Sequence, residues 1–351
     1  MRKKISIILI CILLTGCASK NTGSFVSNDY IYQPPTNYFY NLLSNKDKEL
    51  YDGLYNAFIN QDTKVKSYTD DSETIRKVES NVMQDHPDIF YVKSISIDSK
   101  KNVIIDYYYN SETISKLKKE LVSKRKEIIK EVKNKSTYQQ IEYLYNYVIK
   151  NVAYNENASY NQEITSAMLN KESVCSGYCK MFQYLCLGLD IPCSYMQGKP
   201  IGKDTGQFDG HSWNMIYYQF SYYYIDTTWG DSLEDKGIVD DSYLMFNSSE
   251  MLKLYEPTDT YQKTINSKNC YFDSKDSVIN NYSLSNVEEV VRKNMKDDYV
   301  ILKFTDSNFY SSKSKLINSK QIFTVLTDVG INVDNTNYIA NDQLNTLIIE
   351  W

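Results

Sequence analysis

The sequence lacks several features that would assign it to a common protein class. No cluster of Lys and Arg residues is interleaved with aromatic residues, and the formal net charge is −5, which argues against nucleic-acid binding. There is no internal repeat and no glycine-rich loop of the kind that cradles phosphate. The apolar run Ile5–Leu14 is too short for a stable membrane span. A chain of 351 residues, 42% hydrophobic and 24% charged, instead fits a soluble globular protein that could hold two or three domains.

The sequence contains only two histidines, His86 and His211. His86 precedes Pro87 in a loop between a predicted helix and a predicted strand, where a histidine is more often structural than catalytic. His211 opens the aromatic segment GHSWNMIYYQFSYYYIDTTWGD (210–231), which also contains Asp226. His211 is therefore the candidate residue for acid–base chemistry.

The N-terminal stretch MRKKISIILICILLTGC has a basic start, an apolar run and small residues before Cys17. This is the layout of a cleavable secretory signal, and Leu14–Cys17 resembles the lipobox of bacterial lipoproteins. The resemblance implies that residues 1–16 are removed and that a diacylglyceryl group on Cys17 anchors the chain at the extracytoplasmic face of the bacterial cell membrane. An ordinary signal peptide with a chance cysteine is the alternative. Residues 17–35 are mostly polar and without periodicity, which predicts a tether.

The cysteines do not form the pattern of a disulfide-stabilised fold. Of the seven, Cys11 would leave with the signal peptide and Cys17 would carry lipid. Five in a chain of this length are too few for a disulfide scaffold, and an odd number leaves at least one thiol free unless it pairs between chains. The five are Cys175, Cys179, Cys186, Cys193 and Cys270.

Hydrophobic periodicity divides the rest of the chain into three regions: 36–135, 136–235 and 236–351. The first is predicted to be α+β, with Ser44 capping a helix over residues 46–60. The last is predicted to contain a small α/β unit. The other predicted helices cover 72–83, 111–132, 137–151, 164–169, about 175–188, 287–294 and 313–330, and the predicted strands fall within 85–98, 102–109, 193–198, 211–217, 220–227, 299–306 and 345–351.

The aromatic segment is predicted to be a β-hairpin. If Met215 pairs with Tyr222, His211 lies directly opposite Asp226, with Cβ atoms about 4.5–5.5 Å apart. The carboxylate could then accept a hydrogen bond from Nδ1 and stabilise the imidazolium. A slip of one residue would place the two side chains on opposite faces. Taken alone, such a pair is more often structural than catalytic.

Cys175 gives this pair a possible catalytic role, because it follows Ser173-Val174 at the start of a predicted helix. A helix N-terminus favours a thiolate, and its free N–H groups could hold an oxyanion. Cys175, His211 and Asp226 would then form a nucleophile, a base and an orienting group. A buried structural thiol is the alternative. A zinc site of Cys175, Cys179 and His211 would lack a fourth ligand, so we expect no metal and no cofactor.

Three blocks resemble the transglutaminase-like (papain-related) superfamily in the form common among bacterial surface proteins. They are VCSGYCKMFQYLCLGLDIPCSYMQG, GHSWNMIYY and YYYIDTTWGD, and Tyr154 also matches. The resemblance implies an α+β fold with the nucleophile at a helix N-terminus, packed on an antiparallel sheet. It makes Cys175 the nucleophile, His211 the general base and acid, and Asp226 the orienting residue. Trp213, Asn214 and Trp229 match flanking positions and are candidates to line the cleft.

One departure from the family is Cys179, which stands where a small residue is usual. A disulfide between Cys175 and Cys179 is therefore an alternative state of the site. The resemblance implies a surface-anchored cysteine acyl-transfer enzyme that acts on peptide or protein amides. Hydrolysis is slightly favoured over transamidation. The alternative is a non-catalytic binding module that uses a tyrosine-rich cleft, since the chain contains 33 tyrosines.

Overall fold

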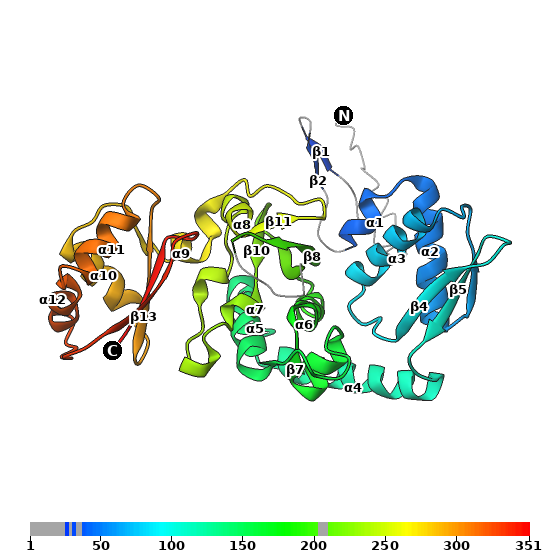
Figure 1. The fold of residues 1–351 in the computed structure, drawn as a ribbon, viewed down its shortest axis with the longest axis horizontal. Helices are drawn as coiled ribbons and strands as arrows, with labels where there is room; N and C mark the ends of the chain where they lie inside the picture. The colour runs from blue at the N-terminus through cyan, green and yellow to red at the C-terminus, as the bar shows by residue number, and fades with distance from the viewer. Residues whose placement is uncertain (1–24, 28–29, 33–36, 203–209) are drawn as a thin grey trace, which may run out of the picture. The chain divides into compact units, whose positions relative to one another are not determined.

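The computed structural model describes residues 25–27, 30–32, 37–202 and 210–351 (Figure 1). The chain divides into two units, residues 1–34 and 35–351. The predicted signal peptide and Cys17 lie outside the described residues. Within the predicted tether, β1 (Phe25–Ser27) and β2 (Tyr30–Tyr32) pair in antiparallel fashion, so this segment is not wholly without secondary structure. No helix among the described residues is long and apolar enough to cross a membrane.

The second unit begins with helices that pack beside a three-stranded antiparallel sheet of order β3-β5-β4. The helix predicted from Ser44 is confirmed: the Ser44 hydroxyl accepts the Asp47 N–H, and Leu50, Leu54 and Phe58 are buried. The elements are α1 (Tyr38–Leu42), α2 (Asn45–Asn60), β3 (Lys64–Lys66), α3 (Ser72–Asp85), β4 (Val92–Ile97), β5 (Asn102–Tyr107) and α4 (Ser111–Lys130).

A four-stranded antiparallel sheet of order β10-β9-β8-β11 carries the candidate site. Helix α6 packs on this sheet, where the Asn214 amide of β9 donates to the Cys179 carbonyl over 3.2 Å. The predicted α+β architecture, a helix beginning at Cys175 on an antiparallel sheet, is confirmed. The elements are α5 (Thr137–Asn151), β6 (Ala153–Tyr154), a π-helical turn (Ser166–Asn170), β7 (Glu172–Ser173), α6 (Cys175–Leu187), β8 (Cys193–Pro200), β9 (His211–Tyr218), β10 (Ser221–Ile225), α7 (Thr227–Gly230), α8 (Ser248–Leu254), β11 (Tyr255–Pro257) and α9 (Tyr271–Ser274).

The boundary predicted at residue 235 is too early for this sheet. Strand β11 pairs with β8 through Tyr255 and Pro200. A strand of three residues has too short a pattern of alternation to be found in the sequence. The fold around the site therefore continues at least to Pro257.

The hairpin forms, but its predicted register is wrong by two residues. Met215 pairs with Tyr224 instead of Tyr222. The reason is the turn: Gln219 and Phe220 both have positive φ, 46° and 63°, and form a two-residue reversal one position later than predicted. A shift of two residues keeps every side chain on its face.

The C-terminal region, residues 278–351, has a hydrophobic core of its own. Its sheet has the order β12-β13-β15-β14. The single helix predicted over 313–330 is instead two helices, separated at Lys320, which has φ of 55°. The strands β12 and β14 were not predicted. The elements are β12 (Val278–Ile279), α10 (Leu284–Asn294), β13 (Tyr299–Phe304), α11 (Phe309–Ile317), α12 (Gln321–Asp328), β14 (Asn337–Asn341) and β15 (Thr346–Glu350).

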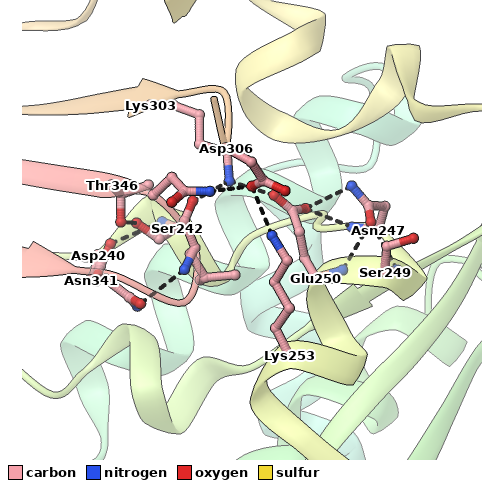
Figure 2. Close-up of polar contacts among 12 residues, drawn as sticks. Asp240, Ser242, Asn247, Ser249, Glu250, Lys253, Lys303, Asp306, Asn341 and Thr346 are labelled. Carbon is pink, nitrogen blue, oxygen red and sulfur yellow. Dashed lines mark hydrogen bonds and ion pairs between the residues drawn. The ribbon is translucent and has the colours of Figure 1, made fainter. Parts of the chain in front are cut away.

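Polar contacts join the C-terminal region to helix α8 and to the loop before it (Figure 2). Lys303 forms an ion pair with Glu250, and both side chains are mostly buried. Lys253 and Asp306 form a second ion pair of 2.8 Å that is more exposed. The Ser242 hydroxyl donates to the Thr346 hydroxyl over 3.0 Å. Helix α8, which leads directly into β11, is thus held from the C-terminal region.

Candidate active site

His211 and Asp226 are hydrogen-bonded, with 2.6 Å between His211 Nε2 and Asp226 Oδ2. The carboxylate is fully buried and the imidazole is 8% exposed. The pair forms although Asp226 lies beyond Ile225, the last residue of β10 in the ladder. The prediction that Nδ1 makes this bond is wrong, because Nε2 makes it. Nδ1 is therefore the ring nitrogen left to interact with the nucleophile.

The Asp226 carboxylate is held from several sides. It caps helix α7, with Oδ1 accepting the backbone N–H groups of Thr228 and Trp229 at 2.9 Å each. Oδ2 accepts the Tyr255 hydroxyl at 2.6 Å in addition to His211. Burial raises the pKa of Asp226, but the charge and hydrogen bond of His211, the Tyr255 hydroxyl and the Trp229 N–H outweigh it and hold the pKa below its ordinary value. The group is therefore a carboxylate at neutral pH.

Cys175 is the first residue of α6, and the residue is partly exposed. The preceding residue, Val174, has an apolar side chain that cannot cap the helix, so no N-cap side chain accepts a hydrogen bond from the first-turn N–H groups. Burial raises the pKa of the Cys175 thiol, but the hydrogen bond and charge of His211 and the backbone N–H of Ser212 reverse the effect and lower it. These groups favour the thiolate.

His211 has the complementary shift. Burial lowers the pKa of its imidazole, but the charge and hydrogen bond of Asp226, together with Cys175, raise it to about 9. The raised pKa of His211 and the lowered pKa of Cys175 favour an imidazolium beside a thiolate near neutral pH. The three predicted residues are therefore brought together in the order that the sequence implied.

The thiol and the imidazole open into a cleft of about 590 Å³. Its size lies in the range of sites for small ligands or for a few residues of a peptide. Tyr195 in its wall was not predicted. Its hydroxyl contacts Ser212 Oγ at 2.6 Å and Ser176 Oγ at 3.2 Å, and these serines directly follow His211 and Cys175 in the sequence. Other side chains of the wall are Tyr154, Glu156, Gln162, Gln197, Lys199 and Thr258.

The three predicted cleft residues support the site from within. Trp213 and Asn214 are fully buried, and Trp229 is 9% exposed. Trp229 stacks on the His211 ring at 4.8 Å between centroids, and Trp213 stacks on Tyr255 at 4.2 Å. The prediction that these three side chains line the cleft is therefore wrong, because they are buried behind the residues that line it. Their match to the family's pattern gave their proximity to His211 but not the direction of their side chains.

The cysteines of the structure are free thiols. Cys179, one turn after Cys175, is fully buried, and burial raises its pKa well above the ordinary value. It therefore lacks the thiolate character of Cys175. Within the part of the chain that the structure describes, no group of three His, Cys, Asp or Glu side chains could hold a metal ion.

A helix that begins at a cysteine, packed on an antiparallel sheet with a histidine–aspartate pair, defines a class of protein. The family model of the transglutaminase-like superfamily matches residues 125–227, and the chain contains a domain of this superfamily.

Particular relatives are more distant. The chain is 25% identical over 155 residues to the kyphoscoliosis peptidase of Homo sapiens, covering 41% of this chain and 23% of that protein. The kyphoscoliosis peptidase of Mus musculus is 32% identical over 77 residues, 20% of this chain and 12% of that protein. A solved structure described as a TGase is 13% identical, with a TM-score of 0.30, over 54% of this chain and 52% of that one. The chain thus spans about a quarter or less of the length of these curated relatives.

Proposed function

We propose that the chain is a cysteine acyl-transfer enzyme that acts on peptide or protein amides. The observation that carries the proposal is the Asp226–His211 bond of 2.6 Å beside Cys175, a partly exposed residue at a helix start that lines a cleft. A buried carboxylate that fixes an imidazolium next to a thiolate is the arrangement needed to activate a cysteine nucleophile.

In the proposed reaction, Cys175 Sγ attacks the amide carbonyl carbon, and the carbonyl π electrons move to oxygen. The first-turn N–H groups of α6 are placed to stabilise that oxyanion. The imidazolium of His211 donates its proton to the amine nitrogen as the C–N bond breaks, which leaves a thioester on Cys175. His211 then removes a proton from the acceptor, whose oxygen or nitrogen attacks the thioester carbon, and the C–S bond breaks to restore the thiolate.

We propose water as the preferred acceptor, so that the reaction is hydrolysis. Cys175 is a partly exposed residue that lines the cleft, and Glu156, Gln162 and Lys199 bring polar groups to the wall of this cleft. A wet cleft favours attack by water over attack by a bound amine. We further propose that the lipid-carrying Cys17 anchors this enzyme at the outer face of a bacterial membrane, where peptides or proteins of the cell envelope would be its substrates.

Alkylation of Cys175 by iodoacetamide, followed by mass spectrometry across pH, tests the proposal without a known substrate. At pH 7 we expect Cys175 to react about tenfold or more faster than a model thiol, because a thiol of pKa about 8.5 is only a few per cent ionised there. His211→Ala should abolish the excess, and the buried thiol of Cys179 provides an internal control. A Cys175 that reacts like a free thiol, unchanged by His211→Ala, would contradict the enzyme and favour a binding module.

A further inference from the structure

The oxygen atoms of Asp226 accept four hydrogen bonds, which is the number that a carboxylate can accept with good geometry. Two come from backbone N–H groups of α7 and one from His211. The fourth comes from Tyr255, which shares Oδ2 with His211. Tyr255 belongs to β11 and lies 29 residues after Asp226, farther along the chain than the other three donors.

Tyr255 is fixed in place by its surroundings. Its side chain is fully buried, and its ring stacks on Trp213 with an interplanar angle of 14° and a centroid distance of 4.2 Å. Burial and the nearby charge of Asp226 raise the pKa of its hydroxyl well above the ordinary value, so the group is a neutral donor. A neutral hydroxyl 2.6 Å from a carboxylate oxygen donates a hydrogen bond to that oxygen and keeps its proton.

The backbone that carries Tyr255 lies unusually close to β8. Gly198 pairs with His211 on one side and with Pro257 on the other. A Cβ atom on Gly198 would lie 2.3 Å from the Glu256 carbonyl oxygen and 2.7 Å from the Trp213 ring. Only a residue without a side chain lets β11 approach this closely and bring the Tyr255 hydroxyl to Asp226.

The C-terminal region fastens the start of the same strand. The Gln343 amide donates to the Lys253 carbonyl at 2.7 Å and to the Ile201 carbonyl at 3.1 Å. Gln343 thereby joins the end of α8 to the end of β8. Two ion pairs also bind α8 to the C-terminal region, Lys303 with Glu250 and Asp306 with Lys253 (Figure 2). Tyr255 is therefore preorganised by contacts from three segments of the chain.

We infer that Tyr255 is a positioning residue, whose hydroxyl keeps the Asp226 carboxylate ionised and aimed at His211, so that His211 can act on Cys175. The inference rests on the proposed function for its catalytic meaning. It extends the Cys175, His211 and Asp226 set by a group that touches neither substrate nor nucleophile. No covalent step is added: the hydroxyl keeps its proton throughout.

Titratable side chains from several elements act on Asp226, and the Asp240 carboxyl group lies near two of them, Tyr145 and Tyr243. The titratable groups that face Asp226 are His211 of β9, Tyr255 of β11, Cys175 and Cys179 of α6, Tyr145 of α5 and Tyr243 of the turn after α7. Of these, the tyrosines and Cys179 stay neutral at physiological pH, since burial raises their pKa values well above the ordinary ones.

The test is Tyr255→Phe, which keeps the ring stack and removes only the hydroxyl. The carbon-13 resonance of the Asp226 carboxyl group reports its titration, and the alkylation rate of Cys175 reports the titration of the coupled site. We expect the Asp226 pKa to rise by about 0.5–1 unit, which is part of the effect of one hydrogen bond to a charged group.

The matched control is Tyr224→Phe in β10 of the same sheet. Tyr224 is equally buried, and its hydroxyl donates over the same 2.6 Å, but to the Gln262 carbonyl. In Tyr224→Phe, the titration of the Asp226 carboxyl group and the pH profile of Cys175 alkylation should coincide with those of the unmodified chain. An Asp226 pKa that is unchanged in folded Tyr255→Phe overturns the inference.

A second measurement needs no variant, in case Tyr255→Phe does not fold. A Tyr255 hydroxyl proton held between two oxygens should give a slowly exchanging proton signal that is lost at the pH where Asp226 protonates. The absence of this signal also overturns the inference. The carbon-13 resonance of Asp226 and the hydroxyl proton signal of Tyr255 do not depend on the reactivity of Cys175. Both measurements therefore remain decisive if the proposed function itself fails.

Discussion

The two histidines of the chain provide a comparison of environments within one molecule. Burial lowers the pKa of His86 to about 4, and the charge of Asp88 raises it to a smaller degree. Burial also lowers the pKa of His211, but Asp226 and Cys175 raise it to about 9. The same desolvation thus has opposite outcomes, and the difference is the ion pair with Asp226.

We expect Asp226→Asn to lower the pKa of His211 by more than about one unit, since a neutral amide no longer offsets the cost of burying the imidazolium. Titration of the two imidazole rings by nuclear magnetic resonance measures this directly. His86 is the control, and its titration should not move. An unchanged His211 titration would show that the 2.6 Å contact has no electrostatic effect.

The same pair gives stability a defined dependence on pH. Because the folded pKa of His211 is raised from 6.5 to about 9, its contribution to the free energy of unfolding is complete below pH 6.5 and is lost as the pH rises through about 9. The pKa of Asp226 is lowered, so its contribution is present above the ordinary aspartate pKa and is lost as the pH falls through the folded pKa. The pair therefore stabilises the fold most in the mildly acidic range.

Among the elements, helix α8 is the one on which the C-terminal region acts. Its two ion pairs differ in burial. Lys303 and Glu250 are 13% and 15% exposed, whereas Lys253 and Asp306 are 39% and 75% exposed. Buried ion pairs become costly when one partner is removed, because the other charge is left without compensation, whereas exposed pairs contribute little.

We therefore expect Lys303→Met to lower the free energy of unfolding by about 1–3 kcal/mol, because it leaves Glu250 buried without a cation. Lys253→Met in the same network should lower it by less than about 1 kcal/mol, because water replaces Lys253 at the exposed Asp306. Urea denaturation followed by circular dichroism compares the two. Equal effects would contradict the assignment of the buried pair as the contact that holds α8.

How far these elements could be predicted depended on their length and on local chemistry. Helix α2 has a capping serine and a long apolar stripe, so both its start and its buried face followed from the sequence. The hairpin strands were also found, but their register depended on a turn of Gln219 and Phe220, which carries no glycine or asparagine to mark it. Strand β11 has three residues and no pattern, so Tyr255 could not be found.

The candidate site was predicted better than the fold around it. Cys175, His211 and Asp226 lie in three sequence blocks that follow one another in the order of the family's pattern, so their proximity could be predicted. The ring nitrogen that bonds Asp226, the inward direction of Trp213 and the fourth donor Tyr255 are different, because they depend on tertiary packing. Such features are decided by which strands lie side by side and are not encoded in local spacing.

For the whole molecule, the proposed location follows from a lipid on Cys17, and this can be tested apart from the chemistry. Two acyl chains hold a protein on a bilayer, whereas the described helices offer no membrane span. We expect the complete chain, expressed in a bacterium that processes lipoproteins, to partition into a detergent phase. Cys17→Ala should appear in the aqueous fraction, with Cys175 alkylated at the rate of the anchored protein. A Cys17→Ala chain that stays with the membrane after a high-salt wash would contradict the lipid anchor and leave the cysteine chemistry of the cleft unaffected.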